Sequence, residues 1–125
     1  MFTGADYDTD AMFDATTSTL VVKTPGRYLL RAALNWNFPE NAVGGRVLLI
    51  IVNGVAVAFD GQDTADVGIN GDISQDVSVI IPLKAGDVIS VQVSQSSGGT
   101  GYSSFLATGP TQHVLPLLQA EWLAP

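Results

Sequence analysis

Apolar and polar residues alternate with a period of two along much of the chain, which predicts β-strands. The clearest run is "RYLLRAALNW", residues 27–36, whose even and odd positions form two separate sets. An α-helix would scatter both sets around its axis, whereas a strand places each set on one face. The face with the odd-numbered residues carries Arg27 and Arg31, so we expect this face to be nearer to water. The apolar set is Tyr28, Leu30, Ala32, Leu34 and Trp36.

Two later segments repeat this alternation. They are "ISQDVSVII", residues 73–81, and "DVISVQVSQSS", residues 87–97. Both contain many β-branched side chains, which suit half-buried strands. The side chains that we expect to face inward are Val77, Val79, Ile81, Ile89, Val91 and Val93.

The segment "RVLLIIVNGVAVAF", residues 46–59, differs because Val47–Val52 is apolar on both faces. Such a pattern is typical of a strand that is covered on both sides. We expect one face to meet the core and the other to meet a neighbouring subunit. Asn53-Gly54 favours the positive backbone angles of a type I′ turn, so it predicts a tight hairpin at this point.

Turn residues separate the remaining segments, and no segment has the pattern of a capped helix. The last candidate strand lies within residues 113–123, where Pro116 favours a sheet edge or a bulge. We count about eight antiparallel strands. The sequence therefore predicts an all-β fold, a single domain over residues 1–125, built as a two-sheet sandwich or jelly roll.

Composition narrows the classes of function. Twelve acidic residues against five basic ones give a net charge of −7, which argues against a nucleic-acid partner. Charged residues make up only 14% of the chain, below the roughly 25% of an average soluble domain. We expect another subunit to cover part of so uncharged a surface. The chain has no cysteine, which excludes thiol catalysis and zinc–thiolate sites.

The N-terminus "MFTGADYDTD" has no basic end and no apolar run, so it does not predict a signal peptide. The longest apolar run, Val47–Val52, is far shorter than the roughly 20 residues of a membrane-spanning helix. A chain of 125 residues is long enough to fold around a core without a disulfide or a structural metal.

Four segments resemble the complement-type globular heads, whose jelly roll is shared with the tumour necrosis factor superfamily. "TPGRYLLRAALNW" resembles the family's P-x-G-x-Y strand, and "LKAGDVISVQV" its later L-x-x-G-D-x-V-x-V strand. "LLIIVNGVAVA" is similar to the hairpin of its microbial members. "YDTDAMFD", followed by "STLVVKTPG", is similar to the lead-in of versions in bacteriophage structural proteins. The resemblance runs from about Asp6 to Val93, and the C-terminal segment departs from the family's aromatic-glycine strand.

The resemblance implies a jelly roll that associates as a homotrimer. No collagen-like Gly-X-Y stalk precedes the domain in this sequence, unlike the animal complement proteins. We therefore expect a non-enzymatic virion structural protein of a bacteriophage, made in the host cytoplasm and placed on the tail tip, a tail fibre or the capsid surface. It would act in particle assembly or host-surface contact. The alternative is a bacterial or secreted head that recognises a protein or a glycan, with or without calcium.

Two acidic clusters are candidates for calcium, which prefers oxygen ligands. The first contains Asp6, Asp8, Asp10 and Asp14. A helical calcium loop that starts at Asp6 needs glycine and an acid where Ala11 and Thr17 stand, so we favour a solvated lead-in to the first strand. The second cluster lies in "FDGQDTADVGINGD", where glycines would let a loop close around an ion. Its calcium candidates are Asp60, Asp63, Asp66 and Asp72.

Catalytic patterns are missing from the sequence. His113 is the only histidine, and there is no G-x-S-x-G elbow around a serine. The only glutamates are Glu40 and Glu121, and nothing in the sequence pairs them across a cleft. We expect neither an enzyme nor a bound cofactor.

Two further sets of residues are candidates for contacts. Small polar residues around an aromatic in "SQSSGGTGYSS" suit an adaptable binding loop, although a plain connector between strands has the same composition. The contact-loop candidates are Gln95, Ser96, Thr100 and Tyr102. The candidates for the trimer interface are Leu48, Ile50, Phe38 and Trp122.

Overall fold

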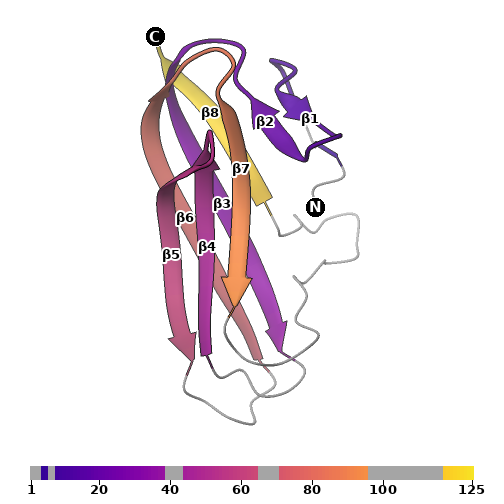
Figure 1. Cartoon of the computed structure of the whole chain (residues 1–125), viewed down its shortest axis with the longest axis vertical. Helices are drawn as coiled ribbons and strands as arrows, with labels where there is room; N and C mark the ends of the chain where they lie inside the picture. The colour runs from indigo at the N-terminus through magenta and orange to yellow at the C-terminus, as the bar shows by residue number, and fades with distance from the viewer. Residues whose placement is uncertain (1–3, 6–7, 39–43, 65–70, 96–116) are drawn as a thin grey trace.

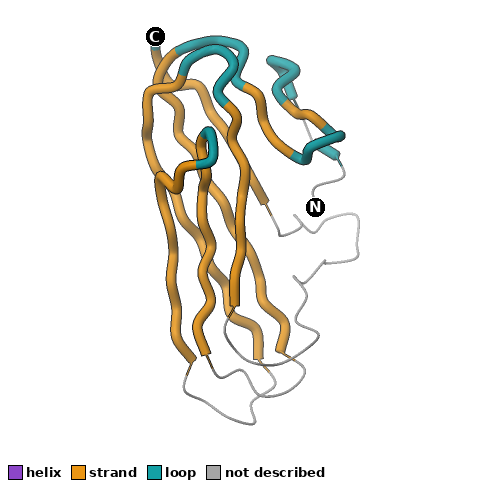
Figure 2. Tube along the Cα trace, in the orientation of Figure 1, coloured by secondary structure: helices purple, strands orange, loops and turns teal. Residues whose placement is uncertain are grey.

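The computed structural model describes residues 4–5, 8–38, 44–64, 71–95 and 117–125. These residues form strands, turns and loops, and Figure 2 shows no helix among them. The described part therefore contains no helix that meets the length and hydropathy needed to cross a membrane. The strands are β1 (Phe13–Asp14), β2 (Thr19–Val21), β3 (Gly26–Phe38), β4 (Gly44–Val52), β5 (Val55–Thr64), β6 (Gly71–Leu83), β7 (Val88–Gln95) and β8 (Leu117–Ala124).

The eight strands form two packed antiparallel sheets, so the prediction of an all-β sandwich is confirmed (Figure 1). One sheet has five strands in the order β1-β2-β7-β4-β5, and the other has three in the order β6-β3-β8. The pairs are nested along the chain: β4 pairs with β5, β3 with β6, and β2 with β7. Strand β8 lies at an edge, as Pro116 just before it suggested.

The core lies between the two sheets and is built from the alternating positions of their inner faces. The predicted inward face of β3 is confirmed from Tyr28 to Leu34, each side chain being at most 3% exposed. Val77, Val79, Ile81 and Val91 pack against this core, and Ile89 is fully buried. The buried cluster is Met12, Val22, Tyr28, Leu30, Ala32, Leu34, Leu48, Ile50, Val52, Leu83 and Ile89.

Val93 corrects the expected inward set. It pairs with Leu48, whose side chain is buried, and so shares the inner face of the five-stranded sheet. Its side chain is nevertheless 44% exposed. Alternation predicts the face on which a residue lies. It does not predict whether the opposite sheet covers that residue, as Val93 near the end of β7 shows.

The predicted Asn53-Gly54 hairpin joins β4 to β5 and is confirmed. Both residues have positive φ, 50° and 81°, as a type I′ turn requires. The side chain of Asn53 also ties this turn to β7, because its Oδ1 accepts a hydrogen bond from Val88 N and its Nδ2 donates one to Asp87 Oδ1, both at 2.9 Å. The backbone amide of Lys84 and then the Asn53 amide lower the pKa of the Asp87 carboxyl, since both bonds favour its charged form.

Side-chain hydrogen bonds join the two sheets along the side where β5 lies near β6. The side chain of Gln75 on β6 is 1% exposed, and its Nε2 donates to the carbonyl oxygens of Arg46 on β4 and Asp60 on β5. On β5, Gln62 donates to the carbonyl oxygen of Ser74 on β6. Side-chain amides thus connect strands of different sheets where no backbone ladder can form.

Candidate interaction surface

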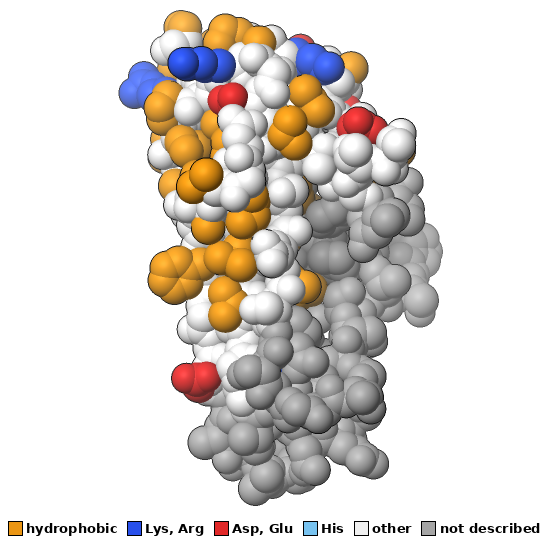
Figure 3. Space-filling model, viewed as in Figure 1, with side chains coloured by type: hydrophobic (Ala, Val, Ile, Leu, Met, Phe, Trp, Pro, Cys, Tyr) orange, Lys and Arg blue, Asp and Glu red, His pale blue; other side chains and the backbone are white. Residues whose placement is uncertain are grey.

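The outer face of the five-stranded sheet is apolar along β4 and β5. Leu48 and Ile50 face the core, so the alternate residues Val47, Leu49 and Ile51 face away from it, and each is half-buried. Leu49 pairs with Phe59 of β5, which places the phenyl ring on the same outer face at 71% exposure. Figure 3 shows hydrophobic side chains gathered over the middle of this side of the molecule.

No charged residue interrupts this outer face across the central part of three neighbouring strands. Strand β7 contributes Ser90, Gln92 and Ser94, which pair with Ile51, Leu49 and Val47. Strand β5 contributes Ala56 beside Ile51 and Gly61 beside Val47. The first charge along β5 on this side is Asp63, which pairs with Gly45 near the strand's end. We call the four residues Val47, Leu49, Ile51 and Phe59 the β4–β5 patch.

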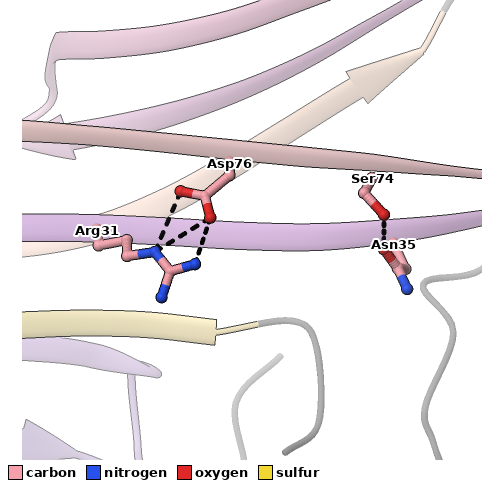
Figure 4. A network of polar contacts seen from close by, with 4 residues as sticks. All are labelled: Arg31, Asn35, Ser74 and Asp76. Atoms are coloured by element: carbon pink, nitrogen blue, oxygen red, sulfur yellow. Dashed lines mark hydrogen bonds and ion pairs between the residues drawn. The ribbon is translucent and has the colours of Figure 1, made fainter.

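The outer face of the three-stranded sheet is different, because it carries charges and polar pairs (Figure 4). The guanidinium of Arg31 on β3 forms a bidentate ion pair with the carboxylate of Asp76 on β6. Hydrogen bonding to Asp76, and then its charge, raise the pKa of Arg31. Further along, the hydroxyl of Ser74 hydrogen-bonds with Asn35. Both side chains are about half exposed, so water reaches this face, and an ion pair exposed in this way contributes little stability.

The candidates for the trimer interface occupy different environments. Leu48 and Ile50 are 1% and 0% exposed within a single chain, so their side chains fill the core and are not available to a second subunit. This corrects their assignment, and the outer apolar residues of the same strand are Val47, Leu49 and Ile51. Trp122 is 46% exposed, and its Nε1 donates to the carbonyl oxygen of Pro25 at 3.3 Å. Phe38 ends β3, and its side chain lies outside the described residues.

Phe59 is the exposed residue that the sequence reading missed. The segment "VAVAF" was expected to form a strand, and no face was assigned to its side chains. Counting back from the Asn53-Gly54 turn would pair Phe59 with the inward-facing Leu48. A register shift between Ile50 and Ile51 instead places Phe59 beside Leu49 on the outer face, so the sequence held no usable signal for its exposure.

The calcium candidates of the second acidic cluster do not converge where the structure describes them. Asp60 and Asp63 both lie on β5, three positions apart, so a regular strand directs their side chains to opposite faces. Asp60 accepts a hydrogen bond from Gln62 at 3.3 Å. Asp66 lies outside the described residues, as does the side chain of Asp72. The search for clusters of three or more metal-ligating side chains among the described residues found none.

The contact-loop candidates lie almost entirely outside the described residues. This holds for Ser96, Thr100 and Tyr102, and His113 lies in the same segment, residues 96–116. Gln95 is the last residue of β7, and its side chain is not described either.

The first acidic cluster has a structural role in the described residues. The carboxylate of Asp8 accepts hydrogen bonds from the backbone amides of Met12 and Phe13, at 2.8 and 2.7 Å. This turn allows the positive φ of Ala11, 51°, and leads Met12 into the core. Asp10 accepts a hydrogen bond from the hydroxyl of Thr24 at 2.9 Å. The amide of Thr16 is the main cause of the lowered pKa of the nearby Asp14 carboxyl.

We expect replacement of Asp8 by alanine to lower the free energy of unfolding by about 1 kcal/mol, because two backbone amides lose a charged acceptor. Urea denaturation of both proteins measures this change. Asp63→Ala, at an exposed position of β5, is the control and should change stability by less than about 0.5 kcal/mol. Calcium should leave the melting temperature of the wild type unchanged. A calcium-induced rise that Asp8→Ala and Asp10→Ala abolish would instead make the lead-in a metal site.

Comparison with known proteins assigns no family. The chain matches no protein-family model and no curated protein sequence.

Proposed function

We propose that the chain is a non-enzymatic structural subunit of a bacteriophage particle that assembles as a homotrimer. It would reside in the virion, on the tail tip, a tail fibre or the capsid surface. The observation that carries this proposal is the nested strand pairing, which agrees with the resemblance of the sequence to complement-type heads. The step from fold to biology rests on that resemblance, since one fold can host many functions.

The nested pairing supports a jelly-roll topology. A jelly roll is a long hairpin rolled into two sheets, so that its central strands pair with each other and strands progressively further out pair in turn. Here β4–β5, β3–β6 and β2–β7 follow that sequence of pairs. The same scheme would pair the first strand with the last. Strand β1 pairs with β2 instead, and the described partner of β8 is β3.

Two experiments test the proposal. Light scattering coupled to size-exclusion chromatography should give three times the mass of the 125-residue chain at micromolar concentration. Mass spectrometry of purified phage particles should detect the chain as a stoichiometric component. A stable monomer would contradict the trimer, and absence from particles would contradict the virion role. Retention of a glycan or protein on an array by a chain absent from particles would favour the ligand-binding head.

A further inference from the structure

We propose that Asn53-Gly54 is a site of spontaneous deamidation, which the folded chain restrains by holding the Asn53 carboxamide against β7. The modified residue releases the β4–β5 turn from β7. This inference does not depend on the proposed function. An asparagine followed by glycine is especially labile, because glycine has no Cβ to hinder attack by its backbone nitrogen.

Deamidation at this pair needs no reagent except water. The backbone nitrogen of Gly54 bonds to Cγ of Asn53, and the bond from Cγ to Nδ2 breaks. The proton that the Gly54 nitrogen loses leaves with Nδ2 as ammonia. Water then adds to either carbonyl carbon of the cyclic imide, and opening of the ring gives aspartate or isoaspartate at position 53. Each product carries a negative charge where asparagine carried none.

Neither burial nor crowding protects this pair. Asn53 and Gly54 are both exposed, so water reaches the turn. A Cβ built on Gly54 meets no atom within 4 Å, so no neighbouring side chain fills the space on that side of its backbone. A restraint on the reaction must therefore come from the bonds that the Asn53 carboxamide makes.

Both polar atoms of the Asn53 carboxamide are bonded. Its Oδ1 accepts from the backbone nitrogen of Val88, and its Nδ2 donates to Oδ1 of Asp87, each at 2.9 Å. The Asp87 carboxylate is fixed in turn, because its Oδ2 accepts from the backbone nitrogen of Lys84 at 2.8 Å. A side-chain amide thus continues the pairing of β4 with β7 beyond the last strand residue.

The order of the strands makes these bonds a restraint. Strand β4 lies between β7 and β5. The carboxamide is bonded on the β7 side, whereas Gly54 begins the return of the chain to β5 on the other side. Ring closure must turn Cγ of Asn53 toward the Gly54 nitrogen, and that rotation breaks both carboxamide bonds.

The product does not fit the site that holds the asparagine. Aspartate at position 53 has no donor for Asp87, and the two carboxylates would face each other at hydrogen-bonding distance. Their repulsion turns the new carboxylate away from β7, and the bond to the Val88 nitrogen is lost with it. Isoaspartate also lengthens the backbone within a tight turn. Deamidation therefore detaches the β4–β5 turn from β7.

The rate of deamidation in the folded and the unfolded wild type tests the restraint without any variant. Mass spectrometry with fragmentation follows the reaction at neutral pH. We expect Asn53 to react about tenfold more slowly in the folded chain than in urea, because the reaction needs local opening. The second pair, Asn70-Gly71, shows that the urea conditions support the reaction, and Asn70 lies outside the described residues. Equal rates for Asn53 in the two states would overturn the restraint.

The matched variants are Asp87→Ala and Asp8→Ala. Each removes a carboxylate that accepts a backbone amide within a turn, but only Asp87 holds Asn53. In the folded state we expect deamidation of Asn53 to be about fivefold faster in Asp87→Ala and to change less than about twofold in Asp8→Ala. Equal acceleration in both would show that general loss of stability sets the rate, and would overturn the role of Asp87.

Reversal of the hydrogen bond tests the effect of the product. Asn53→Asp reproduces the deamidated side chain and should speed hydrogen exchange of the Val88 amide about tenfold. Adding Asp87→Asn exchanges donor and acceptor, and the new side-chain oxygen can still accept from the Lys84 nitrogen. We expect the double variant to exchange within about twofold of the wild type. Wild-type exchange in Asn53→Asp alone, or no recovery in the double variant, would overturn the release of the turn.

Discussion

Replacement of Gln75 by leucine is expected to lower the free energy of unfolding by about 2 kcal/mol. Leucine matches the size of glutamine but has no donor. The Gln75 amide donates to the carbonyl oxygens of Arg46 and Asp60, at 3.2 and 2.9 Å, from a site that is 1% exposed. Water cannot replace a donor in so buried a position without opening the sandwich. The loss therefore includes the desolvation of carbonyl groups that no longer have this partner.

Urea denaturation at one protein concentration measures this effect. Gln119→Leu on β8 is the matched control, because the same chemical change is made at a partly exposed strand position. We expect the control to change stability by less than about 0.5 kcal/mol. Equal losses in the two variants would mean that the cross-sheet bonds of Gln75 contribute nothing beyond ordinary strand packing.

Alternation predicted which residues form the core because most strands have one apolar face and one polar face. On β3 the apolar positions Tyr28, Leu30, Ala32 and Leu34 are all buried, and the two exposed arginines lie opposite. The hairpin was predictable for a different reason. Asn-Gly is one of the few pairs that adopts positive φ at both positions at low cost, so local chemistry alone determines the turn.

The same pattern gave the wrong face for β4. Every residue from Val47 to Val52 is apolar, so alternation does not indicate whether the even-numbered or the odd-numbered side chains face the core. The pairing of β4 with β7 determines which side chains face the core: Leu48 pairs with Val93, and Ile50 pairs with Val91. The sequence of the strand alone does not specify this pairing. For this reason Leu48 and Ile50 were assigned to an interface when they belong to the core.

The sequence also did not indicate which polar side chains are buried. Gln75 and Arg46 are 1% and 0% exposed, yet both residue types are usually found at the surface. The Gln75 amide donates to carbonyl groups of β4 and β5, which lie far from it in the sequence, whereas Nη1 of Arg46 donates to the carbonyl oxygen of the adjacent Gly45. Similarly, Asp8 resembled a calcium ligand, and its hydrogen-bond partners are the amides of its own turn. Residue type alone does not distinguish a carboxylate that binds an ion from one that caps a turn.

Gly86→Ala is the control for a substitution at Gly26, because Gly86 also has a positive φ but lies in open space. Gly86 has a φ of 93°, and a Cβ built there meets no atom within 4 Å. We therefore expect Gly86→Ala to cost about 1 kcal/mol, from the backbone alone.

Gly26→Ala is expected to cost about 2 kcal/mol more than Gly86→Ala, because Gly26 combines an unfavourable φ of 154° with a close approach by β8. A Cβ at this position would lie less than 3.0 Å from the carbonyl oxygen of Ala124 and from Nε1 of Trp122. The indole ring could rotate away, but it would then lose its hydrogen bond to Pro25 O. The backbone oxygen of Ala124 moves only if the end of β8 separates from β3, where Ala124 pairs with Arg27. Thermal and urea unfolding give the stability difference, and a red shift of tryptophan fluorescence would report exposure of Trp122. A Gly26→Ala protein as stable as Gly86→Ala would mean that β8 does not hold this position against β3.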